Sequence, residues 1–403
     1  MSTPDTAPRP SASVASAEGG DAPIRVGIVG YGLAGRVFHA PFLQASPDYR
    51  ISLVSTSDAD RAAQVRERHP GADVVASADE LFARSAELDM VVIASPASAH
   101  LRQGLQALDA HLAVVMDKPF VATVDEALML IERAEALGVP FSVFQNRRWD
   151  GDFLTVKALI ASGRLGEVHR FESTFERWGG PVRDRWQDRE TPADAAGISY
   201  DLGSHLIDQA LELFGPVADF AAELATVRDG SASDDDAFYS LLHESGVQSH
   251  ITVSRVAALA GPRFRVLGTA GAYAVHGLDP QEPLLKEGAA PTDPGFGEAP
   301  EAEWGTLVEA AGDPAGERIP TERGRYADFY ARMADAVRGR GPVPVDRATP
   351  SRPSASSSSR TGGPPATRTE RAAPVDWGPP FPATPASRRT VAVRRPGTQS
   401  GPT

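Results

Sequence analysis

Short apolar runs alternate with amphipathic stretches over the first third of the chain. The apolar runs occupy residues 24–29, 51–54, 90–94, 113–116 and 141–144, and helical periodicity occupies 59–68, 99–110 and 124–137. Strands that alternate with helices are typical of βαβ units, whose strands run parallel. We therefore predict an α/β domain over residues 23–145, built on a doubly wound parallel sheet.

The hydrophobic pattern changes after Asp152. Helical periodicity now covers 153–162, 201–214 and 326–338, and longer strand-like runs lie at 168–175, 238–242, 247–256 and 263–267. Successive strand-like runs separated by turns favour an antiparallel sheet. We predict a second, α+β domain over residues 146–346.

Both ends of the chain lack hydrophobic periodicity. Residues 1–22 predict a disordered leader, with no apolar run of signal-peptide length. Residues 347–403 hold eleven of the 34 prolines and no Ile, Leu, Met, Tyr or Lys, so too little apolar surface is available to offset the entropy of ordering. We predict that this tail is disordered.

The composition of the chain changes abruptly at Arg347. One permitted GC-rich codon choice for residues 348–354 reads, when shifted by one frame, as Asp-Ala-Val-Ala-Ser-Leu, which is an amphipathic helix start. We therefore hypothesise that the sequence from about residue 347 arises from a frameshift. A genuine arginine-rich interaction tail is the alternative.

Charge and composition exclude several classes of protein. The net charge of the 403 residues is −13, and the nine arginines after Asp346 face only two carboxylates, which leaves −20 on residues 1–346. An acidic body of this size repels nucleic acids and anionic membranes, so we expect neither as a partner. The absence of cysteine excludes disulfides and thiolate metal sites and fits a cytoplasmic protein. The histidines show no metal-ligand spacing with carboxylates, and we expect no metal.

A glycine-rich turn follows the first predicted strand. It has the pattern G-x-G-x-x-G over Gly30, Tyr31, Gly32, Leu33, Ala34 and Gly35, and it opens a helix. In a dinucleotide site the first glycine allows the tight turn, the second admits the pyrophosphate, and the third lets helix and strand pack closely. The pattern predicts nucleotide binding; a purely structural turn is the alternative.

The end of the second strand predicts which dinucleotide is bound. An acidic residue there would read the free 2′-hydroxyl of the adenosine ribose, but the chain continues as Ser55, Thr56 and Ser57, and Asp58 comes late. Hydroxyl groups followed by Arg61 suit a 2′-phosphate better, so we predict NADP in preference to NAD. Alternatively, these hydroxyl groups only cap the next helix.

Two further segments carry candidate catalytic groups. Asp117 and Lys118 follow a predicted strand at its carboxyl end, where open α/β sheets bind ligands. Lys118 is one of only three lysines, and an ammonium can tune its pKa where a guanidinium cannot. Asp201 and His205 lie four residues apart, on one face of a helix, and a histidine can take a hydroxyl proton. The alternatives are a surface lysine, and a helix cap followed by a buried histidine.

Taken together, these motifs resemble the glucose-fructose oxidoreductase, inositol dehydrogenase and rhizopine-catabolism (Gfo/Idh/MocA) family over about residues 24–346. Asp117-Lys118-Pro119 stands at the family's Glu-Lys-Pro position. The segments 144–150, 200–209 and 277–282 are similar to the branch that includes NADP-dependent scyllo-inositol dehydrogenases. Two departures are Ala195-Ala196-Gly197, where relatives have a glycine-rich turn, and the tail, where relatives have a closing helix.

The resemblance implies a Rossmann domain, then an α+β domain whose large open sheet supports a homo-oligomer, a dimer or tetramer. It implies hydride transfer between NADP or NAD and a secondary alcohol of a small-molecule polyol or sugar, with His205 as acid/base, Lys118 polarising the reacting oxygen and Asp201 orienting the substrate. The implied cofactor contacts extend to Ser95, Pro96, His100, Asp117, Lys118 and Asn146. A non-catalytic nucleotide-binding regulator, reduction of another carbonyl and an NAD-dependent glycoside cleavage are the alternatives.

Overall fold

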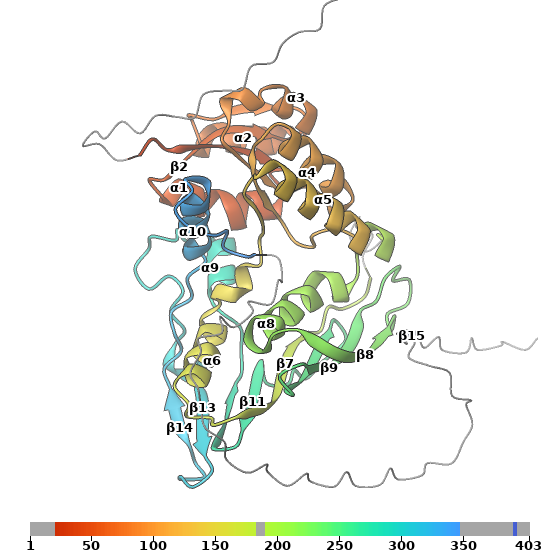
Figure 1. Ribbon diagram of the computed structural model, residues 1–403, viewed down its shortest axis with the longest axis vertical. Helices are drawn as coiled ribbons and strands as arrows, with labels where there is room; N and C mark the ends of the chain where they lie inside the picture. The colour runs from red at the N-terminus through yellow and green to blue at the C-terminus, as the bar shows by residue number, and fades with distance from the viewer. Residues whose placement is uncertain (1–20, 183–189, 347–389, 393–403) are drawn as a thin grey trace, which may run out of the picture.

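The computed structural model describes residues 21–182, 190–346 and 390–392, and two sheets organise them (Figure 1). The first sheet has the strand order β3-β2-β1-β4-β5-β6, and all its strand pairs are parallel. Its strands are β1 (Ile24–Val29), β2 (Tyr49–Ser55), β3 (Asp73–Val75), β4 (Met90–Ile93), β5 (Ala113–Met116) and β6 (Phe141–Val143). The predicted doubly wound parallel sheet is confirmed.

Helices cover both faces of this sheet, because its central strands are apolar on both sides. All residues of β4 and β5 are buried. The helices are α1 (Ala40–Ala45), α2 (Ala59–Arg68), α3 (Ala78–Ala83), α4 (His100–Asp109) and α5 (Val124–Leu137). Local signals set their ends: Thr123 and Glu126 form a capping box at the start of α5, and Gly138 ends it in the left-handed conformation.

The second sheet is mostly antiparallel, as predicted. Within the described residues its order is β14-β13-β12-β11-β7-β10-β9-β8-β15, and only the β7–β10 and β8–β15 pairs are parallel. Its strands are β7 (Val168–Glu176), β8 (Val217–Ala225), β9 (Asp236–His243), β10 (Gln248–Ser254), β11 (Phe264–Gly268), β12 (Gly271–Val275), β13 (Gly305–Glu309), β14 (Glu317–Ile319) and β15 (Thr390–Ala392).

One face of the second sheet is covered by α6 (Gly151–Ala161) and α8 (Ser204–Phe214), as Figure 1 shows. Phe153 and Leu206 of these helices are buried in one apolar core with Phe171 of β7. Large apolar side chains are exposed on two strands near one end of this sheet: Phe220 on β8 is 53% exposed and Leu242 on β9 is 41% exposed. The second domain therefore leaves apolar surface uncovered.

A helix from the predicted second domain completes the core of the first. The chain returns through α9 (Gln281–Glu287) to α10 (Ala327–Val337), and Tyr330 of α10 stacks on Phe42 of α1 with 6.4 Å between ring centroids. The Tyr49 hydroxyl of β2 donates to the Tyr330 carbonyl at 2.6 Å. The core of the first domain therefore combines residues of α1 and β2 with residues of α10.

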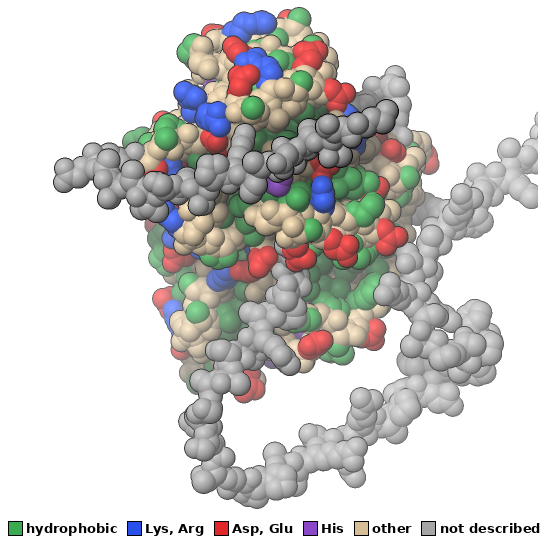
Figure 2. All heavy atoms as spheres, turned by 45° about the horizontal axis from the view of Figure 1, so that its top comes forward, with side chains coloured by type: hydrophobic (Ala, Val, Ile, Leu, Met, Phe, Trp, Pro, Cys, Tyr) green, Lys and Arg blue, Asp and Glu red, His purple; other side chains and the backbone are tan. Residues whose placement is uncertain are grey.

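Most of the predicted leader and tail lies outside the described residues. Of the tail, the structure describes Thr390–Ala392, which pairs with Ala222–Leu224 of β8. Across the described ranges no helix is both long and apolar enough to cross a membrane. On the face drawn in Figure 2, acidic side chains lie dispersed among hydrophobic and uncharged ones rather than in one patch.

Candidate active site

The glycine-rich turn has the geometry of a phosphate cradle. Gly30 has a φ of +90°, and a Cβ there would lie 2.7 Å from the Ala94 carbonyl oxygen. A Cβ at Gly35 would lie 2.1 Å from the Gly30 carbonyl oxygen, so only glycine allows this close approach. At Gly32 the nearest neighbour of a Cβ would be Arg61 Nη1, 3.9 Å away. The first and third glycines serve packing, and the second leaves room for a pyrophosphate.

The end of β2 lies beside this cradle. Ser55 is the last residue of β2, and its carbonyl accepts a hydrogen bond from Gly30 N at 3.1 Å. Thr56 is half-buried and Ser57 is exposed. The side chain that caps α2 belongs to Asp58, which accepts from Arg61 N at 2.9 Å. Because Asp58 performs the capping, the Ser57 hydroxyl is not needed for it. The Arg61 guanidinium is about half exposed and pairs with Asp58, with 3.7 Å between Nε and Oδ2.

His100 holds two loops of the first domain together. Its buried ring lies between the Phe120 carbonyl, 2.9 Å from Nδ1, and the Ser95 carbonyl, 2.9 Å from Nε2. The Ser95 hydroxyl donates to Gln103 at 2.6 Å. His100 therefore helps to fix the position of the Ser95–Pro96 turn, which follows β4.

Lys118 bridges the two domains. It follows β5, and its Nζ donates to Asp201 Oδ1 at 2.8 Å and to the Asp201 carbonyl at 3.2 Å. The preceding Asp117 is buried and accepts from Lys118 N at 2.8 Å. Lys118 is only 25% exposed, so it is not an ordinary surface lysine.

Asp201 is held by two cations. Its second oxygen, Oδ2, accepts from Arg255 Nη2 at 2.7 Å, opposite the Lys118 ammonium. Burial opposes ionisation of this carboxyl, but Lys118 and Arg255 together hold its pKa well below the usual range. Arg255 lies just after β10 and was not predicted, because its sequence surroundings do not distinguish it from the other arginines.

His205 lies in the first turn of α8, which directly follows a π-helical turn (Ser199–Gly203). The ring is 2% exposed, and its Nδ1 lies 2.7 Å from Gln145 Oε1. Burial, together with the charges of Lys118 and Arg147, lowers the pKa of His205 well below 6.5. The imidazole is therefore neutral at neutral pH, as a proton acceptor must be. Asn146, also a predicted site residue, is buried next to Gln145 in the chain.

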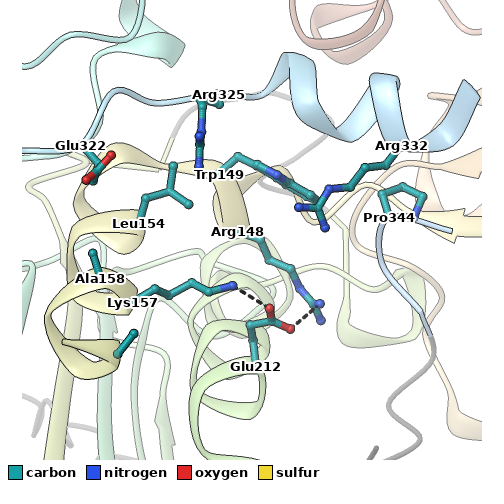
Figure 3. A pocket seen from close by; sticks show the side chains of 11 residues that line it. Arg148, Trp149, Leu154, Lys157, Ala158, Glu212, Glu322, Arg325, Arg332 and Pro344 are labelled. Atoms are coloured by element: carbon teal, nitrogen blue, oxygen red, sulfur yellow. Dashed lines mark hydrogen bonds and ion pairs between the residues drawn. The ribbon is translucent and has the colours of Figure 1, made fainter. Parts of the chain in front are cut away.

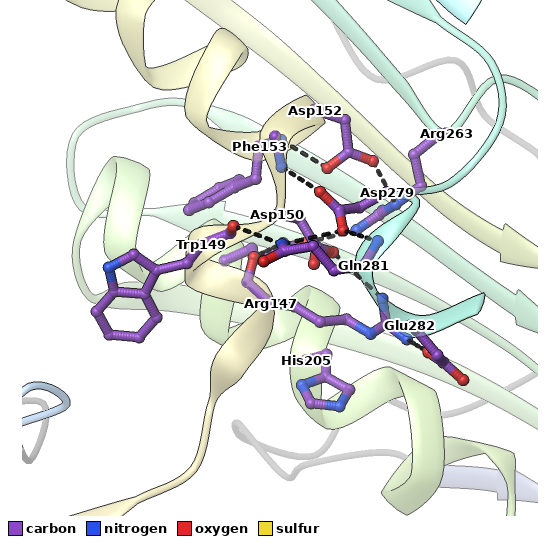
Figure 4. A network of polar contacts seen from close by, with 12 residues as sticks. Arg147, Trp149, Asp150, Asp152, Phe153, His205, Arg263, Asp279, Gln281 and Glu282 are labelled. Carbon is purple, nitrogen blue, oxygen red and sulfur yellow. Dashed lines mark hydrogen bonds and ion pairs between the residues drawn. The ribbon is translucent and has the colours of Figure 1, made fainter. Parts of the chain in front are cut away.

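Two of the long sequence motifs meet in a buried polar network (Figure 4). Gly151 N donates to Asp279 Oδ2 at 2.7 Å, and Arg147 Nη2 lies 2.5 Å from Glu282 Oε2. Burial and the nearby Asp150 carboxylate, with Asp152, raise the pKa of Asp279 to about 8. The contacts show that segments 144–150 and 277–282 form one structural unit.

This network also anchors the helix that carries His205. Gln209, one turn further along α8, donates to the Arg147 carbonyl at 2.7 Å and accepts from Arg263 Nη2 at 2.9 Å. Both Gln209 and Arg263 are almost fully buried. The position of His205 is thus fixed by the contacts of Gln209 on the same helix as well as by the contact of its own ring.

Comparison with known proteins agrees with this geometry. Residues 24–145 match the family model described as an oxidoreductase family with an NAD-binding Rossmann fold, and residues 153–274 match the GFO/IDH/MocA C-terminal domain. The oxidoreductase YdgJ of Escherichia coli K12 is 39% identical over 81% of this chain and 92% of its own length. The chain belongs to the Gfo/Idh/MocA family of oxidoreductases.

Two other members of the family illustrate the similarity. The scyllo-inositol 2-dehydrogenase (NADP(+)) IolW of Bacillus subtilis 168 is 35% identical over 80% of this chain and 88% of its own length. The solved structure of the oxidoreductase YvaA from Bacillus subtilis superposes with a TM-score of 0.76 at 33% identity, covering 81% of this chain and 91% of that one. The predicted family, fold and dinucleotide class are confirmed.

The departure from the family pattern before the π-helical turn has a structural consequence. Ala195 adopts a φ of +58°, a left-handed conformation that glycine adopts without strain. Gly197 has a φ of +112°, and a Cβ there would lie 1.9 Å from Asp234 Oδ1. The backbone therefore keeps a shape suited to glycine, although alanine occupies the first position.

A pocket of about 430 Å³ lies away from these groups, between α6, α8 and α10 (Figure 3). None of the predicted site residues lines it. Glu212 lines this pocket and forms ion pairs with Arg148 and Lys157, at 2.7 and 2.8 Å. Across the described ranges no group of three or more His, Asp or Glu side chains is arranged to hold a metal.

The low pKa of His205 predicts the pH range over which its ring stays neutral. Because the imidazole of the free protein stays neutral as the pH falls through 6.5, kcat/KM of any reaction that uses this ring as proton acceptor should stay constant there and decline only at lower pH. A pH profile of kcat/KM measures this. A decline that begins at or above pH 6.5 would contradict the burial argument.

Proposed function

We propose that this protein is an NADP-dependent dehydrogenase that oxidises a secondary alcohol of a cyclic polyol or sugar, or reduces the corresponding ketone. The observation that carries the proposal is the cluster of Lys118, Asp201 and His205 at the junction of the domains. Lys118 follows β5 in the same sheet whose strand β1 leads into the dinucleotide cradle, and Asp201 and His205 reach it from the π-helical turn and α8. The reaction needs one proton acceptor and one cation beside the reacting oxygen, and the cluster supplies both.

Each side chain has a defined role in this proposal. A bound nicotinamide would supply the acceptor for the hydride of the substrate carbon. His205 takes the hydroxyl proton, and its neutral state favours this transfer. The Lys118 ammonium donates a hydrogen bond to the reacting oxygen and stabilises negative charge there. Asp201, ionised between Lys118 and Arg255, holds the ammonium in place and accepts from a neighbouring substrate hydroxyl.

A substrate panel tests this function. Cyclic polyols, sugars and simple ketones would each be assayed with NADP(H) and NAD(H), scored by nicotinamide absorbance. Turnover of at least one polyol or sugar supports the proposal. Tight nucleotide binding with no turnover across the panel would favour a non-catalytic regulator of the same fold.

The preference for NADP is supported by the groups at the end of β2. In a Thr56→Asp variant the new carboxylate should repel the 2′-phosphate and lower the NADP-to-NAD ratio of kcat/KM roughly tenfold. The Thr56→Asn variant introduces a side chain of the same shape as aspartate but without its charge, and it should keep the wild-type ratio of kcat/KM for NADP to that for NAD. An unchanged ratio in Thr56→Asp would mean that the adenosine ribose lies elsewhere.

We also propose that the exposed apolar surface of the second sheet, which includes Phe220 and Leu242, supports a homo-oligomer. Burial of such residues between subunits would remove them from water. Light scattering coupled to size-exclusion chromatography measures the oligomeric state.

A further inference from the structure

Gln145 lies between the two domains and faces the histidine of the active site. It follows β6, the last strand of the first sheet, and its backbone N donates to the Val143 carbonyl at 2.9 Å. Its side-chain oxygen Oε1 lies 2.7 Å from His205 Nδ1. The glutamine was not among the predicted site residues.

We propose that Gln145 is a positioning residue that fixes the tautomer of His205 and leaves Nε2 as the proton-accepting atom. An amide oxygen only accepts hydrogen bonds, so the Nδ1 atom that faces it carries the hydrogen. A neutral imidazole has one N–H, and Nε2 therefore keeps its lone pair. The inference rests on the proposed function, in which His205 takes the hydroxyl proton.

The charges around His205 explain why an oriented partner is needed. The charged groups that face the ring are Lys118 after β5, Arg147 in the segment after β6, Asp201 in the π-helical turn and Arg263 before β11. Three of the four are cations, so they favour the neutral ring but do not select which nitrogen keeps the hydrogen. If the hydrogen were on Nε2, that atom would have no lone pair with which to accept the proton of a substrate hydroxyl beside it. Gln145 supplies the selection.

The hydrogen bond also depends on how the domains are docked. Gln145 leaves the first sheet, whereas His205 belongs to α8 of the second domain. The Lys118–Asp201 ion pair crosses the same junction. The correct tautomer is therefore set only when the two domains are in contact.

Two substitutions of Gln145 separate this role from a structural one. Gln145→Glu keeps an acceptor at Nδ1 but adds negative charge, so it should raise the pKa of His205 and move the acid limb of kcat/KM upward by about one pH unit or more. Gln145→Leu has a similar size but no acceptor. It should lower kcat roughly 10²-fold, while the Kd of NADPH, followed by fluorescence, stays within about twofold of wild type.

A spectroscopic measurement tests the tautomer without turnover. In protein labelled with ¹⁵N-histidine at neutral pH, His205 should show a protonated Nδ1 and an unprotonated Nε2, with its signals assigned by their loss in His205→Ala. The Gln145→Leu variant should lose this pattern. Gln106→Glu, on the outer helix α4, makes the same change in charge and should shift neither the spectrum nor the acid limb.

The outcomes distinguish the two proposals. If His205→Ala keeps wild-type turnover, the proposed function fails. If His205→Ala loses activity but Gln145→Leu turns over at the wild-type rate, or His205 carries its hydrogen on Nε2, only the role of Gln145 is refuted.

Discussion

Replacing His205 with alanine should lower the turnover number by roughly 10²-fold or more, because the proton of the substrate hydroxyl then has no acceptor in the site. Binding of NADPH should be almost unchanged, since the glycine-rich cradle lies in the other domain. The loss should appear in kcat and kcat/KM alike, as expected for an interaction made in the transition state. Steady-state kinetics and a nucleotide titration measure the two effects separately.

The matched control for this variant is His243→Ala. His243 is equally buried, and its ring nitrogens contact the Gly215 carbonyl and the Ser249 hydroxyl, each at 2.8 Å. Its removal should lower the melting temperature without a comparable loss of turnover. Similar turnover in His205→Ala and wild type would remove His205 from the mechanism.

Lys118→Arg should also reduce turnover by roughly 10²-fold, although it preserves the charge. The guanidinium is planar and longer, and its fork would bind Asp201 in a different geometry, so no compact donor would remain beside the reacting oxygen. Single-turnover measurements would show whether the loss lies in the chemical step.

Lys157 provides an unusually close control for Lys118. Its Nζ pairs with Glu212 Oε1 at 2.8 Å, the same distance as between Lys118 Nζ and Asp201 Oδ1. Lys157 is more exposed and lies on α6, so Lys157→Arg should keep wild-type activity. If both arginine variants were fully active, Lys118 would be no more than a structural partner of Asp201.

The sequence was sufficient for the elements that carry a strong local pattern. The hydrophobic pattern correctly predicts β4 and β5, the strands that are apolar on both faces. It also predicts the capped helix α5. Some strands were missed. β3 has too few residues for a period of two to stand out, and β8 has nine residues but is rich in alanine and mostly exposed, so it shows no regular alternation. The strength of the apolar pattern, rather than strand length, decided which strands could be predicted.

The candidate site divides in the same way. The glycines, Lys118, Asp201 and His205 belong to motifs with defined spacing, so they could be predicted from the chain alone. Arg255 could not, because its role depends on a contact made across 54 residues and its neighbours in the sequence form no motif. Gln145 lies in the segment 144–150 that resembles the family, but nothing in that segment indicates its contact with His205, 60 residues further along the chain.

The packing of α10 on the first domain has a consequence for how the protein is made. His39 and its partner Tyr330 are separated by 291 residues, and they form a 2.6 Å hydrogen bond in a buried core. At about 5–20 residues per second, a ribosome would need roughly 15–60 s to synthesise the intervening chain. Until then the nascent nucleotide-binding domain exposes the apolar surface around Phe42 and Tyr49. A fragment ending at residue 145 should therefore depend on chaperones and aggregate when released alone.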